Sequence, residues 1–281
     1  MCGGLENDKI IETALSIEMF QTGILMHDDI IDNGETRRNK PSAYMRLGGN
    51  HFGKSMAICL GDLGFPFANE LILNSDFKEE YKIKALKYMN NIFFGTIYGE
   101  IMDVDFTKNN NIEEKEIIDM YTLKTAYYTI TGPLQIGAAL AGASEDILEN
   151  IKKFGTNAGI MFQIKDDILG IYSEEEMVGK STSSDIREGK NTLLSKKALK
   201  FSDEKTQQKI KSIYGANNNV NKEDIEYIRN IFSNTGAKAE CEKEILKYYE
   251  NAFTVINDMT NDEKAREIII DLLKYLKERD K

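Results

Sequence analysis

Apolar residues recur at helical spacing along nearly the whole chain, and this periodicity restricts the fold more than any other feature. It predicts a first helix ending near Asp32, then helices at about 52–74, 78–104, 113–143 and 144–172. We expect Pro133 to kink or split the fourth of these helices, and Thr260 with Glu263 to form a capping box before the last one. Polar loops are expected at 35–42 and 173–190, and no segment alternates as a strand would. The sequence therefore predicts an all-α protein with a single domain over residues 1–281.

Composition excludes several classes of protein. A hydrophobic fraction of 41% is too high for a disordered chain, and a net charge of −10 argues against a nucleic-acid partner. We find no apolar run of the roughly 18 residues that a membrane span needs, and no signal peptide. The three cysteines are isolated, which is typical of a reducing cytoplasm. We expect a soluble, cytoplasmic protein.

One short acidic string occurs twice, each time after an apolar helical run. Residues 27–32 read HDDIID and residues 165–170 read KDDILG. Asp28 and Asp32 lie one helical turn apart and so share a face, where two carboxylates repel each other unless a cation lies between them. Oxygen ligands favour Mg²⁺ or Mn²⁺ over zinc, and Mg²⁺ takes part of its shell from substrate phosphates. The alternative is a pair of acids that merely solvates a helix end. The repetition of the string makes this alternative less favourable.

Basic residues follow these acids. Arg37 and Arg38 come just after the first cluster, and arginine binds phosphate with two parallel donors. Further cations are Lys124 on a helix and Lys180 and Lys190 on the long polar loop. A metal ion between the acids and a phosphate, with the basic side chains on the far side of the phosphate, would make the charges alternate in sign. This arrangement favours a phosphorylated ligand. A solvated basic loop remains open as the alternative.

Taken together, the motifs resemble the polyprenyl synthetase family, the trans-isoprenyl diphosphate synthases. The match follows the family's order almost from end to end: Asp28-Asp29-x-x-Asp32, Arg37-Arg38, Gly61-Asp62, Gly99-Glu100-x-x-Asp103, Lys124-Thr125, Phe162-Gln163-x-x-Asp166-Asp167, Gly179-Lys180 and 185–190. The resemblance implies an isoprenoid synthase-type helical bundle around a deep central cavity. It also implies a Mg²⁺-dependent prenyltransferase, in which an allylic diphosphate ionises and isopentenyl diphosphate attacks the carbocation. Loss of a proton then gives a longer trans-prenyl diphosphate.

The resemblance also implies roles for individual residues. The magnesium site would comprise Asp28, Asp29, Asp32, Asp166 and Asp167, with Asp28, Asp32 and Asp166 as direct ligands. Contacts to the allylic diphosphate would come from Arg37, Lys124, Lys180 and Lys190. Contacts to isopentenyl diphosphate would come from Arg38 and Gln21, while Thr125 and Gln163 would lie near the cationic carbon.

In this family, the residues four and five before the first Asp line the hydrocarbon pocket, and bulky aromatic residues there stop chain growth early. Here these residues are Ile24 and Gly23, and Phe20 is one turn further from the acids. We therefore expect a product longer than farnesyl, geranylgeranyl or beyond, with Phe20 as the floor of the pocket. An ordinary core position for Phe20 is the alternative.

The sequence also departs from the family pattern. The family's upstream Gly-Lys-x-x-Arg segment, which binds isopentenyl diphosphate, has no counterpart after Met1, Gly170 replaces a third Asp, and Glu100 stands where Gln is usual. The first departure leaves open a non-catalytic regulatory subunit of a hetero-oligomeric synthase. A terpene cyclase fits less well because its second site typically has an Asn/Ser/Glu pattern. Family resemblance further implies a homodimer.

Overall fold

The computed structural model describes residues 8–109, 111–172, 184–216 and 220–280. Its N-terminal half comprises α1 (Asp8–Ile31), β1 (Thr36–Arg37), β2 (Lys40–Pro41), α2 (Ala43–Arg46), α3 (His51–Leu73), α4 (Glu79–Phe106), α5 (Glu114–Tyr121), the π-helix η1 (Thr122–Thr131) and α6 (Gly132–Leu140). The remainder comprises α7 (Glu145–Tyr172), α9 (Ser184–Glu188), α10 (Leu193–Phe201), α11 (Glu204–Ile213), α12 (Lys222–Asn234), α13 (Ala237–Thr254), α14 (Ile256–Met259) and α15 (Glu263–Glu278). The predicted all-α class is confirmed.

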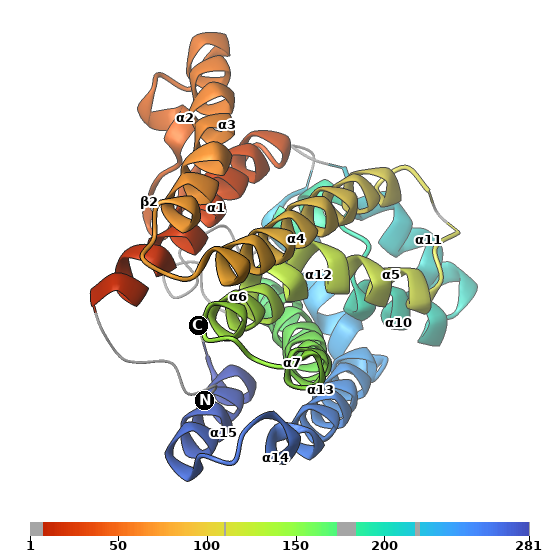
Figure 1. Ribbon diagram of the computed structural model, residues 1–281. Helices are drawn as coiled ribbons and strands as arrows, with labels where there is room; N and C mark the ends of the chain where they lie inside the picture. The colour runs from red at the N-terminus through yellow and green to blue at the C-terminus, as the bar shows by residue number, and fades with distance from the viewer. Residues whose placement is uncertain (1–7, 110, 173–183, 217–219, 281) are drawn as a thin grey trace.

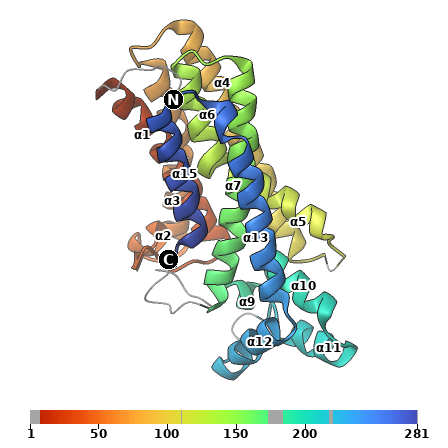
Figure 2. The ribbon, with the colours of Figure 1, turned by 90° about the horizontal axis from the view of Figure 1, so that it is seen from below.

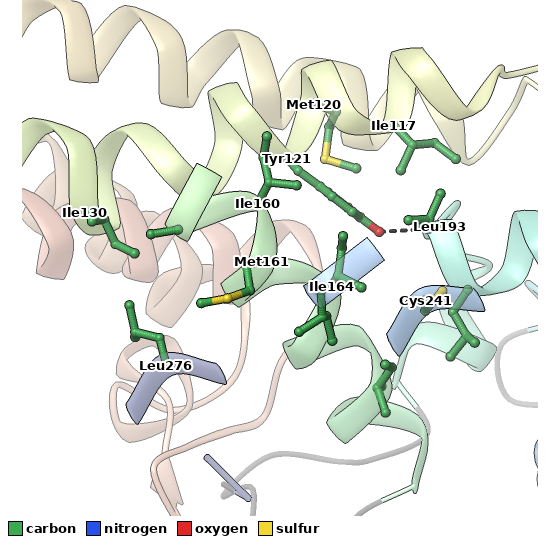
Figure 3. Packing of buried hydrophobic residues seen from close by; sticks show 14 of the residues in the cluster. Ile117, Met120, Tyr121, Ile130, Ile160, Met161, Ile164, Leu193, Cys241 and Leu276 are labelled. Carbon is green, nitrogen blue, oxygen red and sulfur yellow. Dashed lines mark hydrogen bonds between the residues drawn. The ribbon is translucent and has the colours of Figure 1, made fainter. Parts of the chain in front are cut away.

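The long helix α7 lies at the centre of the larger hydrophobic core. It packs against η1 on one side and α13 on another, and Figure 2 shows α7 and α13 running side by side. Fully buried side chains such as Phe154, Met161 and Ile164 on α7 meet residues from α5, α10 and α13 in this core (Figure 3). Burial of such side chains is worth about 1.5–3 kcal/mol each, so α7 is firmly held.

Helices α1 and α3 form a pair beside this core (Figure 1). Their backbones approach closely at Gly23, where an added Cβ would lie 2.6 Å from the carbonyl oxygen of Gly61. Phe20 lies one turn away on α1 and is buried in a second apolar cluster, with its ring centroid 5.7 Å from that of Phe65 and 6.0 Å from that of Phe93. This packing fixes the orientation of α1 and therefore of the acids at its C-terminal end.

The helix boundaries agree closely with the periodicity, but local geometry differs in four places. The irregularity expected at Pro133 lies before it, in η1, and Pro133 begins the next α-helix, where a missing N–H is tolerated. A short hairpin occupies part of the expected loop at 35–42, and α9 forms within the loop expected at 173–190. The predicted capping box at Thr260 was wrong, because Asp262 caps α15 by accepting from the backbone N–H of Ala265.

The sequence has no uninterrupted apolar run of about 18 residues, but one described helix has the length and mean hydropathy that a membrane span needs. By length and composition α3 qualifies among the described helices, with 23 residues. Only 28% of its most apolar window is buried in the fold. The helix does not form one apolar run because Lys54, Asp62 and Glu70 interrupt it.

Candidate active site

A cavity of about 380 Å³ lies among α1, α4, η1 and α7. Most of the residues singled out from the sequence line it: Gln21, Ile24, Asp28, Asp32, Arg37, Arg38, Lys124, Thr125, Gln163, Asp166, Asp167 and Lys190. Two acid clusters that are more than 130 residues apart therefore face one space. Asp29, Phe20 and Gly23 lie outside the lining, and Lys180 lies outside the described residues.

The β1–β2 hairpin directs Arg37 onto the first acid cluster. Its two turn residues, Arg38 and Asn39, have positive φ, which a two-residue hairpin turn of this kind requires but non-glycine residues rarely adopt. Arg37 donates from Nη2 to Asp28 at 2.7 Å and from Nε to Asp29 at 2.8 Å. Burial raises the pKa of Asp29 although the Arg37 charge opposes this shift. Asp29 thus serves to hold Arg37, while Asp28 faces the cavity.

Two lysines join the first cluster to α4. Lys190 donates to Asp32 and to Asp103, each at 2.7 Å. Lys124 donates to the same Asp103 oxygen at 2.6 Å and contacts Asp28 at 3.6 Å. Burial by itself would raise the pKa of Asp103, but the two lysine charges hold it below its ordinary value. Asp103 therefore fixes both lysines at the cavity wall.

Lys124 reaches this position because of the helices that carry it. It lies in η1, and π-helical segments are rare and occur frequently at functional sites. Gly99 on α4 faces it, where an added Cβ would lie 2.2 Å from the backbone nitrogen of Lys124. Burial alone would lower the pKa of Lys124, but Asp103, Asp28 and Glu100 together raise it well above its ordinary value. The lysine is therefore a permanent cation.

The second acid cluster separates into two differently placed side chains. Asp166 accepts from Nη2 of Arg279 at 2.9 Å, and the same guanidinium stacks on the Phe162 ring at 3.8 Å. Asp167 is 5% exposed and accepts hydrogen bonds from the Tyr121 hydroxyl and from the side-chain amide of Gln163. Burial, and then the charge of Asp185, raise the pKa of Asp167 well above its ordinary range.

These bonds continue to the neutral oxygens on the cavity wall. Gln163 donates to Asp167 at 2.8 Å, and its carbonyl oxygen accepts from the Thr125 hydroxyl at 2.6 Å. The Tyr121 hydroxyl accepts in turn from the backbone N–H of Leu193 at 2.8 Å, as Figure 3 shows. The orientation of Gln163 is thus fixed by a chain of bonds that begins in the core.

The chain resembles characterised proteins over nearly its full length. The polyprenyl synthetase family matches residues 1–232. The chain belongs to the polyprenyl synthetase family. It is 32% identical to geranylgeranyl diphosphate synthase of Sulfolobus acidocaldarius over 277 residues, which cover 98% of the chain and 81% of that protein. It is 31% identical to geranylfarnesyl diphosphate synthase of Aeropyrum pernix over 284 residues, covering 99% of the chain and 86% of that protein.

Solved structures agree with this family. Geranylgeranyl pyrophosphate synthase of Corynebacterium glutamicum, solved with isoprenyl diphosphate and magnesium, superposes with a TM-score of 0.91 at 28% identity, covering 98% of this chain and 80% of that one. The isoprenoid synthase-type fold is therefore confirmed. So is the class of enzyme, a prenyltransferase that elongates isoprenyl diphosphates. None of the relatives named here is a regulatory subunit, so that alternative gains no support.

The donor set of the cavity fits the divalent metal expected of a polyprenyl synthetase. Among the described residues, no group of three or more His, Cys, Asp or Glu side chains is placed to hold a metal by itself. Asp28 on α1 and Asp32 directly after it line the same cavity as Asp166 on α7, and each of the three is paired with a protein cation. Oxygen donors on two opposed walls, with most of the shell left to water or phosphate, suit Mg²⁺.

Several residues of this site had no assigned role at the sequence level. Glu100 and Asp103 belong to the Gly99-Glu100-x-x-Asp103 motif, so the sequence indicates that they are part of the site. It does not indicate that both contact Lys124. Tyr121 was visible only as an aromatic residue three positions before that lysine. Arg279 carries no local signal, because it lies 113 residues from Asp166 in the sequence.

Proposed function

We propose that this protein condenses an allylic diphosphate with isopentenyl diphosphate to give a longer trans-prenyl diphosphate, geranylgeranyl or beyond. One observation carries the proposal: the acids of α1 and α7 line one cavity together with Arg37, Lys124 and Lys190. A diphosphate placed there meets both these cations and the carboxylates that would hold a metal. Ile24 at the cavity wall leaves room for a long hydrocarbon chain, and Phe20 lies deeper on the same helix.

The first requirement of the reaction is a stabilised leaving group. Mg²⁺ held by Asp28, Asp32 and Asp166, with Mn²⁺ as a substitute, would supply positive charge to the departing diphosphate. The chain's own contribution is a set of fixed cations. Lys124 and Lys190 are already oriented by Asp103, so little reorganisation accompanies bond breaking.

The second requirement is protection of the carbocation. Thr125 and Gln163 present neutral oxygens that stabilise positive charge without reacting with it, and their mutual hydrogen bond fixes them. Ile24, Leu25 and Phe162 add apolar surface to the cavity wall, which excludes water. Arg38 and Gln21 at the same cavity are the proposed contacts to isopentenyl diphosphate.

Incubation of the protein with farnesyl diphosphate, labelled isopentenyl diphosphate and Mg²⁺ tests this proposal. We expect labelled prenyl diphosphates of 20 carbons or more, and no incorporation when Asp28 and Asp32 are both changed to Asn. Absence of labelled product with the unaltered chain, under conditions where a related synthase is active, would refute the proposed activity.

We further propose a homodimer in the cytoplasm. Large apolar side chains remain exposed at helical spacing on α3 and α4: Phe52, Met56, Leu60, Leu63, Phe67, Phe94, Ile97, Tyr98 and Ile101. Two such stripes on neighbouring helices suit burial against a second copy better than contact with water. The free thiols of Cys59 and Cys241 suit a reducing compartment. Light scattering should give twice the monomer mass, and a Leu63→Glu/Phe67→Glu variant should give the monomer mass.

A further inference from the structure

Glu100 places a carboxylate in the cavity that the proposed reaction does not use. Its Oε2 lies 2.8 Å from Nζ of Lys124, and its side chain is 18% exposed. The other oxygen, Oε1, is buried and has no hydrogen-bond partner among the described residues. Glu100 lies one helical turn before Asp103 on α4, so both carboxylates approach the same lysine from one helix.

Lys124 does not need Glu100 as a counter-ion. Asp103 is closer, at 2.6 Å, and Asp28 adds a third carboxylate at 3.6 Å. Arg37 and Lys190 also contact two of these carboxylates, but with Asp29 and Asp32 included the cluster has at least five carboxylates and three cations. An anionic ligand that binds to Lys124 meets the surplus charge of Glu100 beside it.

We infer that Glu100 lowers the affinity of this site for diphosphate, because Glu100 and the diphosphate compete for Lys124. The inference rests on the proposed function only in taking a diphosphate as the anion. While Glu100 contacts the ammonium group, its negative charge at the cavity wall offsets part of the lysine charge. The effect on catalysis is weaker substrate retention together with faster release of the diphosphate products.

The substitution Glu100→Gln tests this inference, because it removes the charge and keeps the shape. The probe is inorganic pyrophosphate with Mg²⁺, measured by isothermal titration calorimetry. A charge in a partly buried cleft is screened much less than in water, so we expect pyrophosphate to bind about tenfold more tightly. In steady-state assays, both KM for the allylic diphosphate and kcat should fall.

Two further variants separate charge from packing. Glu100→Asp keeps the charge, so its pyrophosphate affinity should stay within about twofold of the unaltered protein. A packing role would give the opposite result, because Gln keeps the shape of Glu and Asp is shorter: Glu100→Gln would bind as the unaltered protein does and Glu100→Asp would differ. Glu114→Gln is the matched control, because Glu114, like Glu100, pairs with lysine, here with Lys197 at 3.0 Å and Lys200 at 2.9 Å, but lies outside the cavity. It should leave pyrophosphate binding unchanged.

The outcomes distinguish this inference from the proposed function. Equal or weaker pyrophosphate binding by Glu100→Gln, with an unchanged melting temperature, overturns the role of Glu100 whatever the enzyme synthesises. Tighter binding in a protein that makes no prenyl product would refute the proposed activity and support the role of Glu100. If the unaltered protein fails to bind pyrophosphate with Mg²⁺, both are wrong.

Discussion

Replacing Asp103 with Asn tests the electrostatic network that holds the site. One carboxylate oxygen accepts from both Lys124 and Lys190, and the side chain is only 7% exposed. Removing one partner of a buried ion pair costs about 3–5 kcal/mol. Both lysines keep another carboxylate, Glu100 and Asp32, so we expect a loss near the lower limit, about 3 kcal/mol.

This loss translates into a measurable shift in melting temperature. Unfolding entropy of about 2.1 cal/mol/K per residue over 281 residues gives about 0.6 kcal/mol/K for the chain. A loss of about 3 kcal/mol therefore lowers the melting temperature by about 5 °C in scanning calorimetry. Asp105→Asn is the matched control, since Asp105 is exposed on the same helix, and should shift it by less than about 1 °C.

The sign of the pH dependence adds a second check. The pKa of Asp103 is held below its ordinary value of 3.8 by the lysines, in spite of burial. The stability it contributes is then complete above about pH 4 and is lost as the pH falls through the lower pKa of the folded state. The difference in unfolding free energy between the two proteins should be constant from pH 8 to 5. Equal stability at pH 7, or a difference that grows in acid, would refute the reasoning.

Three further substitutions test other parts of the site. Phe20→Ala should lengthen the main product by at least one isoprene unit in mass spectrometry, because it opens the deep end of the pocket; an unchanged product would show that Phe20 only packs the core. Arg279→Gln should tighten Mn²⁺ binding about threefold in spin-resonance titrations, because it removes a competing positive charge from Asp166; unchanged affinity would contradict such competition. Asp167→Asn should lower kcat about tenfold without weakening Mn²⁺ binding, because Asp167 orients Gln163; weaker Mn²⁺ binding would make it a direct ligand.

Much of the fold could be predicted from the sequence because most long helices of this protein have one face against a core. The periodicity of apolar residues locates α1, α3, α4 and α7 to within a few residues of their observed bounds. It does not predict η1, because the spacing of apolar residues does not distinguish a π-helix from an α-helix over one short segment. The membrane-length character of α3 is not apparent as a single apolar run because Lys54, Asp62 and Glu70 interrupt it.

The motifs predict which residues form the site, but they do not predict that the two acids of each pair have different contacts. Asp28 and Asp29 are neighbours in sequence, yet only Asp28 lines the cavity. Asp166 and Asp167 both line the cavity, but their partners differ, because the turn of the helix brings Asp166 to Arg279 and Asp167 to Tyr121. Such distinctions depend on partners brought together by folding, and local patterns do not contain them.

The central claim is that acids on α1 and α7 act together on one diphosphate. A crystal structure of the protein grown with Mg²⁺ and inorganic pyrophosphate tests it most directly. We predict one pyrophosphate in the cavity, with metal ions joining it to Asp28 and Asp32 on one side and to Asp166 on the other. Pyrophosphate bound elsewhere, or metal held by one helix alone with no shared ligand, would contradict the account.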